Sequence, residues 1–110
     1  MPDSQPFLEY ELYLPTISPQ GTLYSQDILR QTRQELIDFF GGLTDTRQKN
    51  EGLWKIGGVT VRDEIVIWRI LSNRGQAGDQ FIRNAKTELQ KLLRQNEILV
   101  VRRQVERMFS

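Results

Sequence analysis

The sequence predicts an α+β domain whose strands and helices follow one another in the order β-α-β-β-α-β. The stretch 52–72, GLWKIGGVTVRDEIVIWRILS, is rich in β-branched residues and has the pattern of two strands folded on each other. A segment with helical spacing lies on each side of it, and a further strand-like run lies beyond each helix. This order is the split βαβ, or ferredoxin-like, motif. We therefore expect a four-stranded antiparallel sheet with two helices on one face.

The length of 110 residues fits one domain with a single core. Residues 1–6 contain two prolines and predict a flexible N-terminus, which leaves residues 7–110 for the domain. No apolar run approaches the roughly 18 residues of a membrane-spanning helix, and the N-terminal residues lack the pattern of a signal peptide. We expect a cytoplasmic protein with no membrane partner.

The first strand is predicted by an alternation of side chains over residues 7–14, which Pro15 ends. One face carries Leu8, Tyr10, Leu12 and Leu14, and the other carries Phe7, Glu9, Glu11 and Tyr13. The leucine-rich face should pack against the helices. The second face should therefore lie on the uncovered side of the sheet, which we call the open face.

The first helix should begin after Ser25, a suitable N-cap, and end at Gly41-Gly42. Residues 44–51 follow as a polar loop. Strand two is predicted over residues 53–61, with Gly57-Gly58 inside it as a bulge. The charged residues 62–64 form the predicted turn between the two strands.

Strand three, residues 65–71, is apolar on both faces except for Arg69, which indicates a central strand covered on both sides. If Arg69 points to the open face, the alternation places Trp68 under the helices. Residues 73–78 are predicted to be a flexible connector, and Asp79 can cap the second helix. The last strand should begin at Ile98 and extend through Val105.

The chain contains no histidine and no cysteine, so the commonest general base and the thiolate nucleophile are both missing. Metal sites built on imidazole or thiolate are excluded for the same reason. The sequence also lacks a glycine-rich phosphate loop that leads into a helix. We expect no metal and no cofactor.

Charged residues are predicted to meet on the open face. Glu9 and Glu11 lie two residues apart on the first strand, and Arg69 lies on its expected neighbour. One interpretation is a set of cross-strand ion pairs that fixes the register. The other is a small ligand-binding site, in which Arg69 binds an anion, Glu9 or Glu11 acts as a base, and Tyr13 and Trp54 complete the site.

Apolar residues share this face with the charges. If Arg69 points to the open face, then Ile65, Ile67 and Leu71 join it there, with Phe7 nearby. An uncovered apolar sheet of this size is unusual on a monomer. We predict a homodimer in which a second copy covers the open face.

A nucleic-acid-binding module of the same strand order would need aromatic residues on the first and third strands. Here the third strand is acidic at its start and carries one aromatic residue, and the net charge is only +1. Nucleic acid is therefore an improbable partner.

Short motifs resemble a pattern in small uncharacterised bacterial proteins. They are Phe40-Gly41-Gly42-Leu43-Thr44, Gly52-Leu53-Trp54, Gly57-Gly58-Val59 and Asp63-Glu64-Ile65-Val66-Ile67. The resemblance implies the ferredoxin-like α+β fold and brings no assigned activity.

The leading hypothesis is a non-enzymatic, self-associating domain that binds a protein or a small ligand. One alternative is a small enzyme of the dimeric α+β barrel type, with a pocket between sheet and helices that uses Arg69, Glu11 or Tyr13. In that enzyme, residues 73–78 or 44–51 could form a lid. A second alternative is weak binding of single-stranded nucleic acid, which would fall steeply with salt.

Overall fold

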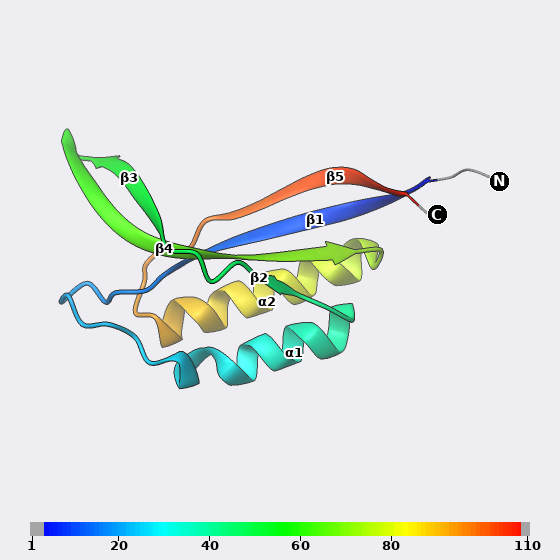
Figure 1. Cartoon of the computed structure of the whole chain (residues 1–110), viewed down its shortest axis with the longest axis horizontal. Helices are drawn as coiled ribbons and strands as arrows, with labels where there is room; N and C mark the ends of the chain where they lie inside the picture. The colour runs from blue at the N-terminus through cyan, green and yellow to red at the C-terminus, as the bar shows by residue number, and fades with distance from the viewer. Residues whose placement is uncertain (1–3, 109–110) are drawn as a thin grey trace.

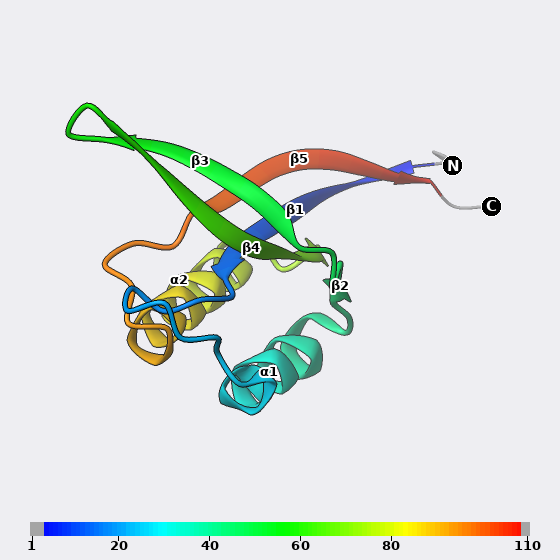
Figure 2. The same ribbon diagram turned by 60° about the vertical axis from the view of Figure 1, so that its left-hand side comes forward.

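The fold is the predicted ferredoxin-like α+β arrangement, seen in a computed structural model that describes residues 4–108 (Figure 1). An antiparallel sheet of five strands lies on two helices, which cover one of its faces (Figures 1 and 2). The elements in chain order are β1 (Ser4–Pro15), η1 (Gln26–Leu29), α1 (Arg30–Phe40), β2 (Thr44–Asp45), β3 (Asn50–Ile56), β4 (Val59–Ser72), α2 (Gly75–Leu92) and β5 (Val100–Met108).

The five strands occupy only four positions across the sheet, because two short strands share one edge. The order along the sheet is β2-β4-β1-β5, and β3 also pairs with β4. Because β2 pairs with residues 68–69 of β4 and β3 pairs with residues 59–65, the two short strands follow one another along the same edge. The four-stranded prediction is confirmed with one edge strand interrupted.

The core lies between the sheet and the helices, as the alternation in the first strand predicts. Its buried members are Tyr10, Leu12, Leu14, Leu36, Trp68, Ile70, Ile82, Ala85, Leu89, Leu93 and Ile98. The even-numbered residues of β1 and β4 supply the sheet side of this core. The predicted place of Trp68 under the helices is confirmed, since only 1% of its surface is exposed.

The hairpin turn lies at Gly57-Gly58, so the turn predicted at residues 62–64 and the bulge predicted at the glycines are both wrong. Both glycines have positive φ angles, 57° and 81°. A two-residue hairpin turn of the type that matches strand twist requires this conformation, which glycine adopts without a steric cost. Arg62, Asp63 and Glu64 continue β4 and pair with residues 51–53.

The relocated turn makes β4 14 residues long. Its first half and β3 form a hairpin, residues 51–64, which we call the arm. The arm bends away from the helices and extends beyond the body of the sheet (Figures 1 and 2). Since β3 makes extensive contacts only with β4, the arm packs against little else in its own chain.

The two helices begin and end for local reasons. The Ser25 side chain accepts a hydrogen bond from the Asp27 N–H at the start of η1, and Gly41 ends α1 with a left-handed backbone, φ 86°. Helix α2 begins at Gly75, so the flexible connector predicted at residues 73–78 and the Asp79 cap are wrong. Ser72 fixes the entry to the helix instead, because its Oγ accepts a hydrogen bond from the Arg74 N–H at 3.0 Å.

The two segments predicted as possible lids lie partly in regular structure. Residues 75–78 belong to α2, and the predicted loop 44–51 contains β2 and the start of β3. Neither α1 nor α2 is long and apolar enough to cross a membrane.

Replacing Gly78 by alanine should destabilise the fold by about 1–2 kcal/mol. A Cβ atom at this position would lie 2.8 Å from Ser72 Oγ and 3.2 Å from Arg74 Cβ, so it would disturb the start of α2. The clash should outweigh the gain of up to about 1 kcal/mol in helix propensity. Urea unfolding measures the difference, and the exposed Gln76→Ala in the same turn serves as the control. A Gly78→Ala protein as stable as the parent would show that the contact relaxes freely.

Candidate functional site

A buried carboxylate organises the charges on the open face. Glu11 lies at the centre of β1, directly opposite Arg69 of β4, and only 4% of its surface is exposed. Its Oε2 accepts a hydrogen bond from Arg69 Nε at 2.8 Å, and its Oε1 accepts one from Arg103 Nη2 at 2.5 Å. Glu9 pairs with the same arginine: its Oε1 lies 2.8 Å from Arg103 Nη1. We call these four residues the charge cluster.

The charge cluster keeps its central carboxyl ionised. The hydrogen bond from Arg69 lowers the pKa of Glu11 below its usual value, burial opposes this effect, and Arg103 adds to the lowering. Glu11 in turn raises the pKa of Arg69. Because the carboxylate is held by two guanidinium groups, it is poorly suited to accept a proton from a substrate near neutral pH.

The predicted ligand-site residues lie in two separate places. Tyr13 is next to the charge cluster, with its hydroxyl 3.4 Å from Glu11 Oε1. Trp54 lies on the arm, where its ring packs over Gly52 and 37% of its surface is exposed. Arg103 joins the cluster from β5, the other neighbour of β1 in the sheet. Arg102, its neighbour, points to the opposite face and pairs with Asp79 at 2.5 Å.

Asp79 and Tyr10 form a second polar contact beneath the sheet. The Tyr10 hydroxyl donates a hydrogen bond to Asp79 Oδ1. Burial and this hydrogen bond raise the pKa of Tyr10 well above its usual value, so the phenol stays protonated. Asp79 therefore joins α2 to both β1 and β5. It has this role instead of the predicted role as a helix cap.

The residues predicted to form a dimer interface all lie at positions of their strands that face the open side of the sheet. Ile65 and Phe7 are nearly covered, at 7% and 9% exposed, whereas Leu71 is 47% exposed. Arg107 lies over the Phe7 ring, 5.6 Å from its centroid. Ile67 is half-buried between these groups and lies opposite Tyr13.

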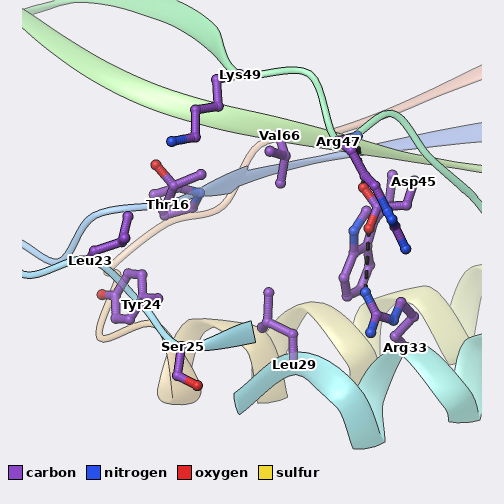
Figure 3. A pocket seen from close by; sticks show the side chains of 12 residues that line it. Thr16, Leu23, Tyr24, Ser25, Leu29, Arg33, Asp45, Arg47, Lys49 and Val66 are labelled. Atoms are coloured by element: carbon purple, nitrogen blue, oxygen red, sulfur yellow. Dashed lines mark hydrogen bonds and ion pairs between the residues drawn. The ribbon is translucent and has the colours of Figure 1, made fainter. Parts of the chain in front are cut away.

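A cavity of about 510 Å³ lies on the other side of the sheet, and we call it the helix-side cavity. It is bordered by the end of β1, residues 23–25, the first helix and the turn after β2, with β4 as its floor (Figure 3). Arg33, Arg47 and Lys49 line it together with Asp45. The sequence allowed a pocket between sheet and helices but assigned it Arg69, Glu11 and Tyr13, none of which lines this cavity, because residues 44–51 gave only the signal of a polar loop.

The arginine of α1 is joined to β2 within the cavity. Arg33 Nη1 lies 3.3 Å from Asp45 Oδ2, as the dashed line in Figure 3 marks. The other oxygen of Asp45 accepts a hydrogen bond from the Arg47 N–H at 3.0 Å. Lys49 has its own partner, Glu64 Oε1 at 3.2 Å. Within residues 4–108, no group of three or more acidic side chains is arranged to hold a metal ion.

The sequence matches no known protein family and no curated protein. Solved structures with the same arrangement include a phage SAM lyase in complex with S-methyl-5'-thioadenosine, with a TM-score of 0.66 and 12% identity. The match covers 93% of this chain and 89% of that chain. The apo state of a phage SAM lyase has a TM-score of 0.61 and 12% identity, covering 98% and 92%.

A divalent cation tolerance protein, Cut A1 from Thermus thermophilus, also matches, with a TM-score of 0.55 and 11% identity. That match covers 86% of this chain and 82% of the other. Likeness at these identities shows the fold alone: a small α+β domain of the ferredoxin-like class. The resemblance to a bacterial family through the motifs at residues 40–44 and 52–54 stays a prediction.

Proposed function

We propose that this chain is a self-associating binding domain, in which two copies form a homodimer through their open faces and each copy holds a small ligand. The observation that carries the proposal is a stripe of apolar side chains on the open face of β4, the face that the helices leave uncovered, interrupted by the charged Asp63 and Arg69. Its members are Val59, Val61, Ile65, Ile67 and Leu71, joined by Trp54 and Ile56 of β3.

Strand geometry places the members of this stripe on one face. Alternate residues of a strand share a face, so the odd-numbered residues of β4 lie on the open face with Arg69 and Glu11. Trp54 and Ile56 lie opposite Val61 and Val59 in the ladder and extend the same surface onto the arm. On the other face of the arm, the side chains are Glu51, Leu53, Lys55, Thr60 and Arg62, which are mostly polar.

A second copy would cover the exposed side chains of the stripe. Ile56 and Val59 at the tip of the arm are 65% and 64% exposed. Isolated apolar residues on a surface are ordinary, but the exposed members Trp54, Ile56, Val59 and Val61 lie together on one face of the arm, and such a cluster marks an interaction surface. A second copy is the simplest partner because twofold dimers are the commonest assembly, and the bend of the arm toward the open face would let each copy reach past the other.

The ligand-binding half of the proposal has a different support. A phage SAM lyase of the same fold was solved in complex with S-methyl-5'-thioadenosine, so a domain of this kind is able to hold a small molecule. In this chain the helix-side cavity has the volume of such a site. The enzyme alternative has less support, because Arg69, Glu11 and Tyr13 lie on the open face and not in this cavity.

Replacing Ile67 by aspartate should dissociate the dimer and leave the fold intact. Ile67 lies outside the buried core, so the helices should keep their packing. Burying an unpaired carboxylate between two sheets should raise the dimer dissociation constant by roughly 100-fold. Sedimentation velocity measures the constant, and circular dichroism checks the fold. A dimer that survives Ile67→Asp unchanged would remove the open face as the interface.

The contribution of the arm can be separated with two neighbouring residues of β4. Val61→Asp places a charge on the open face of the arm, whereas Thr60→Asp places it on the opposite face. Only Val61→Asp should weaken the dimer. Equal effects of the two substitutions would show that the arm acts through its charge and not through its apolar face.

A further inference from the structure

We propose that the helix-side cavity binds a small molecule in which a phosphate or carboxylate is attached to an apolar body. The inference rests on the ligand-binding half of the proposed function, and it names both the place and the class of ligand. Three features carry it: an apolar wall fixed by the core, an arginine whose guanidinium has no partner among residues 4–108, and a backbone geometry that holds this arginine at the rim.

The apolar wall comes from β4 and the first helix. Trp68 and Val66 of β4 form the floor. Leu29 lies on the helix side of the cavity and faces Val66 (Figure 3). Tyr24 closes one end, and its hydroxyl donates a hydrogen bond to the Leu93 carbonyl, which fixes the ring. These side chains belong to the core or pack against it, so the wall exists before any ligand binds.

The cationic side of the cavity is only partly neutralised. Arg33 is paired with Asp45, and Lys49 is paired with Glu64. For the Arg47 guanidinium, no hydrogen bond or ion pair is found within residues 4–108. A cavity lined by two paired cations and one unpaired arginine has an excess positive charge beside an apolar floor. Such a surface favours an anion over a neutral or cationic group.

The backbone holds Arg47 in an unusual conformation. Its φ angle is 53°, in the left-handed region that residues other than glycine rarely adopt. Two sets of hydrogen bonds fix it. The Asp45 carboxylate accepts from the Arg47 N–H, and Thr46 is tied to Ile67 of β4 through its N–H at 3.1 Å and its Oγ1 at 3.3 Å.

Strained backbone is retained at sites where the position of a side chain matters. Arg47 is therefore positioned in advance rather than left on a free loop. A guanidinium offers paired N–H donors that match the oxygens of a phosphate or a carboxylate. The apolar floor then contributes binding energy from the remainder of the ligand, and the volume of about 510 Å³ accommodates a ring.

A titration with three related probes tests the class of ligand. Phenyl phosphate and benzoate carry an anion on the same ring, and benzyl alcohol is the neutral control. The ¹⁵N-labelled protein is followed by two-dimensional NMR, in which the indole signals of Trp68 and Trp54 report on the cavity and on the arm. We expect the anionic probes to shift the Trp68 indole and the Leu29 and Val66 amides while the Trp54 indole stays in place.

The relative affinity of the anionic probes tells a phosphate site from a carboxylate site. Equal or tighter binding of benzyl alcohol would overturn the anionic class. Shifts confined to the charge cluster would overturn the cavity as the site while leaving a ligand-binding domain. The probes are added up to roughly 10 mM, which is ten times a dissociation constant of about 1 mM. The absence of any shift at that concentration would overturn the inference. Self-association is measured separately by sedimentation and does not depend on these outcomes.

The arginine is tested with a matched variant. Arg47→Gln should weaken the binding of the better anionic probe about tenfold, the loss expected for one hydrogen bond to a charged group. The control is Arg94→Gln, because Arg94 also has a left-handed backbone, φ 50°, but lies at the end of α2 outside this cavity. Equal affinities of the two variants would remove Arg47 from the site. Thermal unfolding of both variants shows whether either substitution acts through stability instead.

Discussion

Replacing Trp68 by alanine is expected to lower the free energy of unfolding by about 3–5 kcal/mol, the largest effect of any single substitution considered for this chain. Trp68 is on the central strand β4, 1% exposed, and belongs to the buried core. The substitution removes a large side chain from between the sheet and the helices and leaves a cavity that the surrounding core cannot fill. Since small domains are stable by roughly 5–15 kcal/mol, a large part of the margin would be lost.

Urea unfolding followed by far-ultraviolet circular dichroism measures this loss. The chain offers a matched control in its other tryptophan, Trp54, which lies on the arm and is 37% exposed. Trp54→Ala should change the stability of the monomer by less than about 1 kcal/mol, because it removes few contacts within its own chain. It should weaken self-association instead. Comparable losses of monomer stability in the two variants would contradict the separation between a core tryptophan and an interface tryptophan.

The faces of β1 could be predicted from the sequence because the relevant signal is local. Side chains alternate from Leu8 to Leu14, and a period of two leaves no other way to bury the leucines. On β4, which is apolar on both faces, the same rule left the face of Arg69 undecided and placed Trp68 inside only if Arg69 pointed to the open face. The end of α1 was also predictable, since Gly41 supplies the left-handed residue that ends a helix.

The sequence prediction misplaced the turn of the hairpin because two local signals competed. The charged run at residues 62–64 suggested a turn, whereas Gly57-Gly58 meets the backbone requirement of a two-residue turn. A polar residue is tolerated on an exposed arm, but positive φ angles are costly for residues other than glycine, so the glycines determine the turn. The sequence allowed a pocket between sheet and helices, but it could not identify the residues that line the helix-side cavity. The cavity forms where residues 23–25 and 45–49 approach each other in space, and no local pattern describes that approach.

The second large effect concerns the buried carboxylate of the charge cluster. Glu11→Gln should destabilise the domain by about 1.5–3 kcal/mol at pH 7, because it removes the charge that accepts hydrogen bonds from Arg69 and Arg103. The sign of the pH dependence follows from the lowered pKa of Glu11. A carboxyl whose pKa is lowered by folding stabilises the protein above its unfolded pKa, about 4.3. This stabilisation is lost as the pH falls from there through the folded-state pKa.

The measurement is the difference in unfolding free energy between the parent and Glu11→Gln from pH 7 to the acid limit of folding. Other carboxyl groups titrate in the same range, but they are common to both proteins and cancel in the difference. We expect the difference to be constant at neutral pH and to shrink below about pH 4.3, as Glu11 becomes protonated and the two side chains become alike. Glu9→Gln is the matched control, since Glu9 shares Arg103 but is the more exposed partner. Its effect should stay within about 1 kcal/mol. A difference for Glu11→Gln that does not change with pH would show that the carboxylate acts through packing and not through its charge.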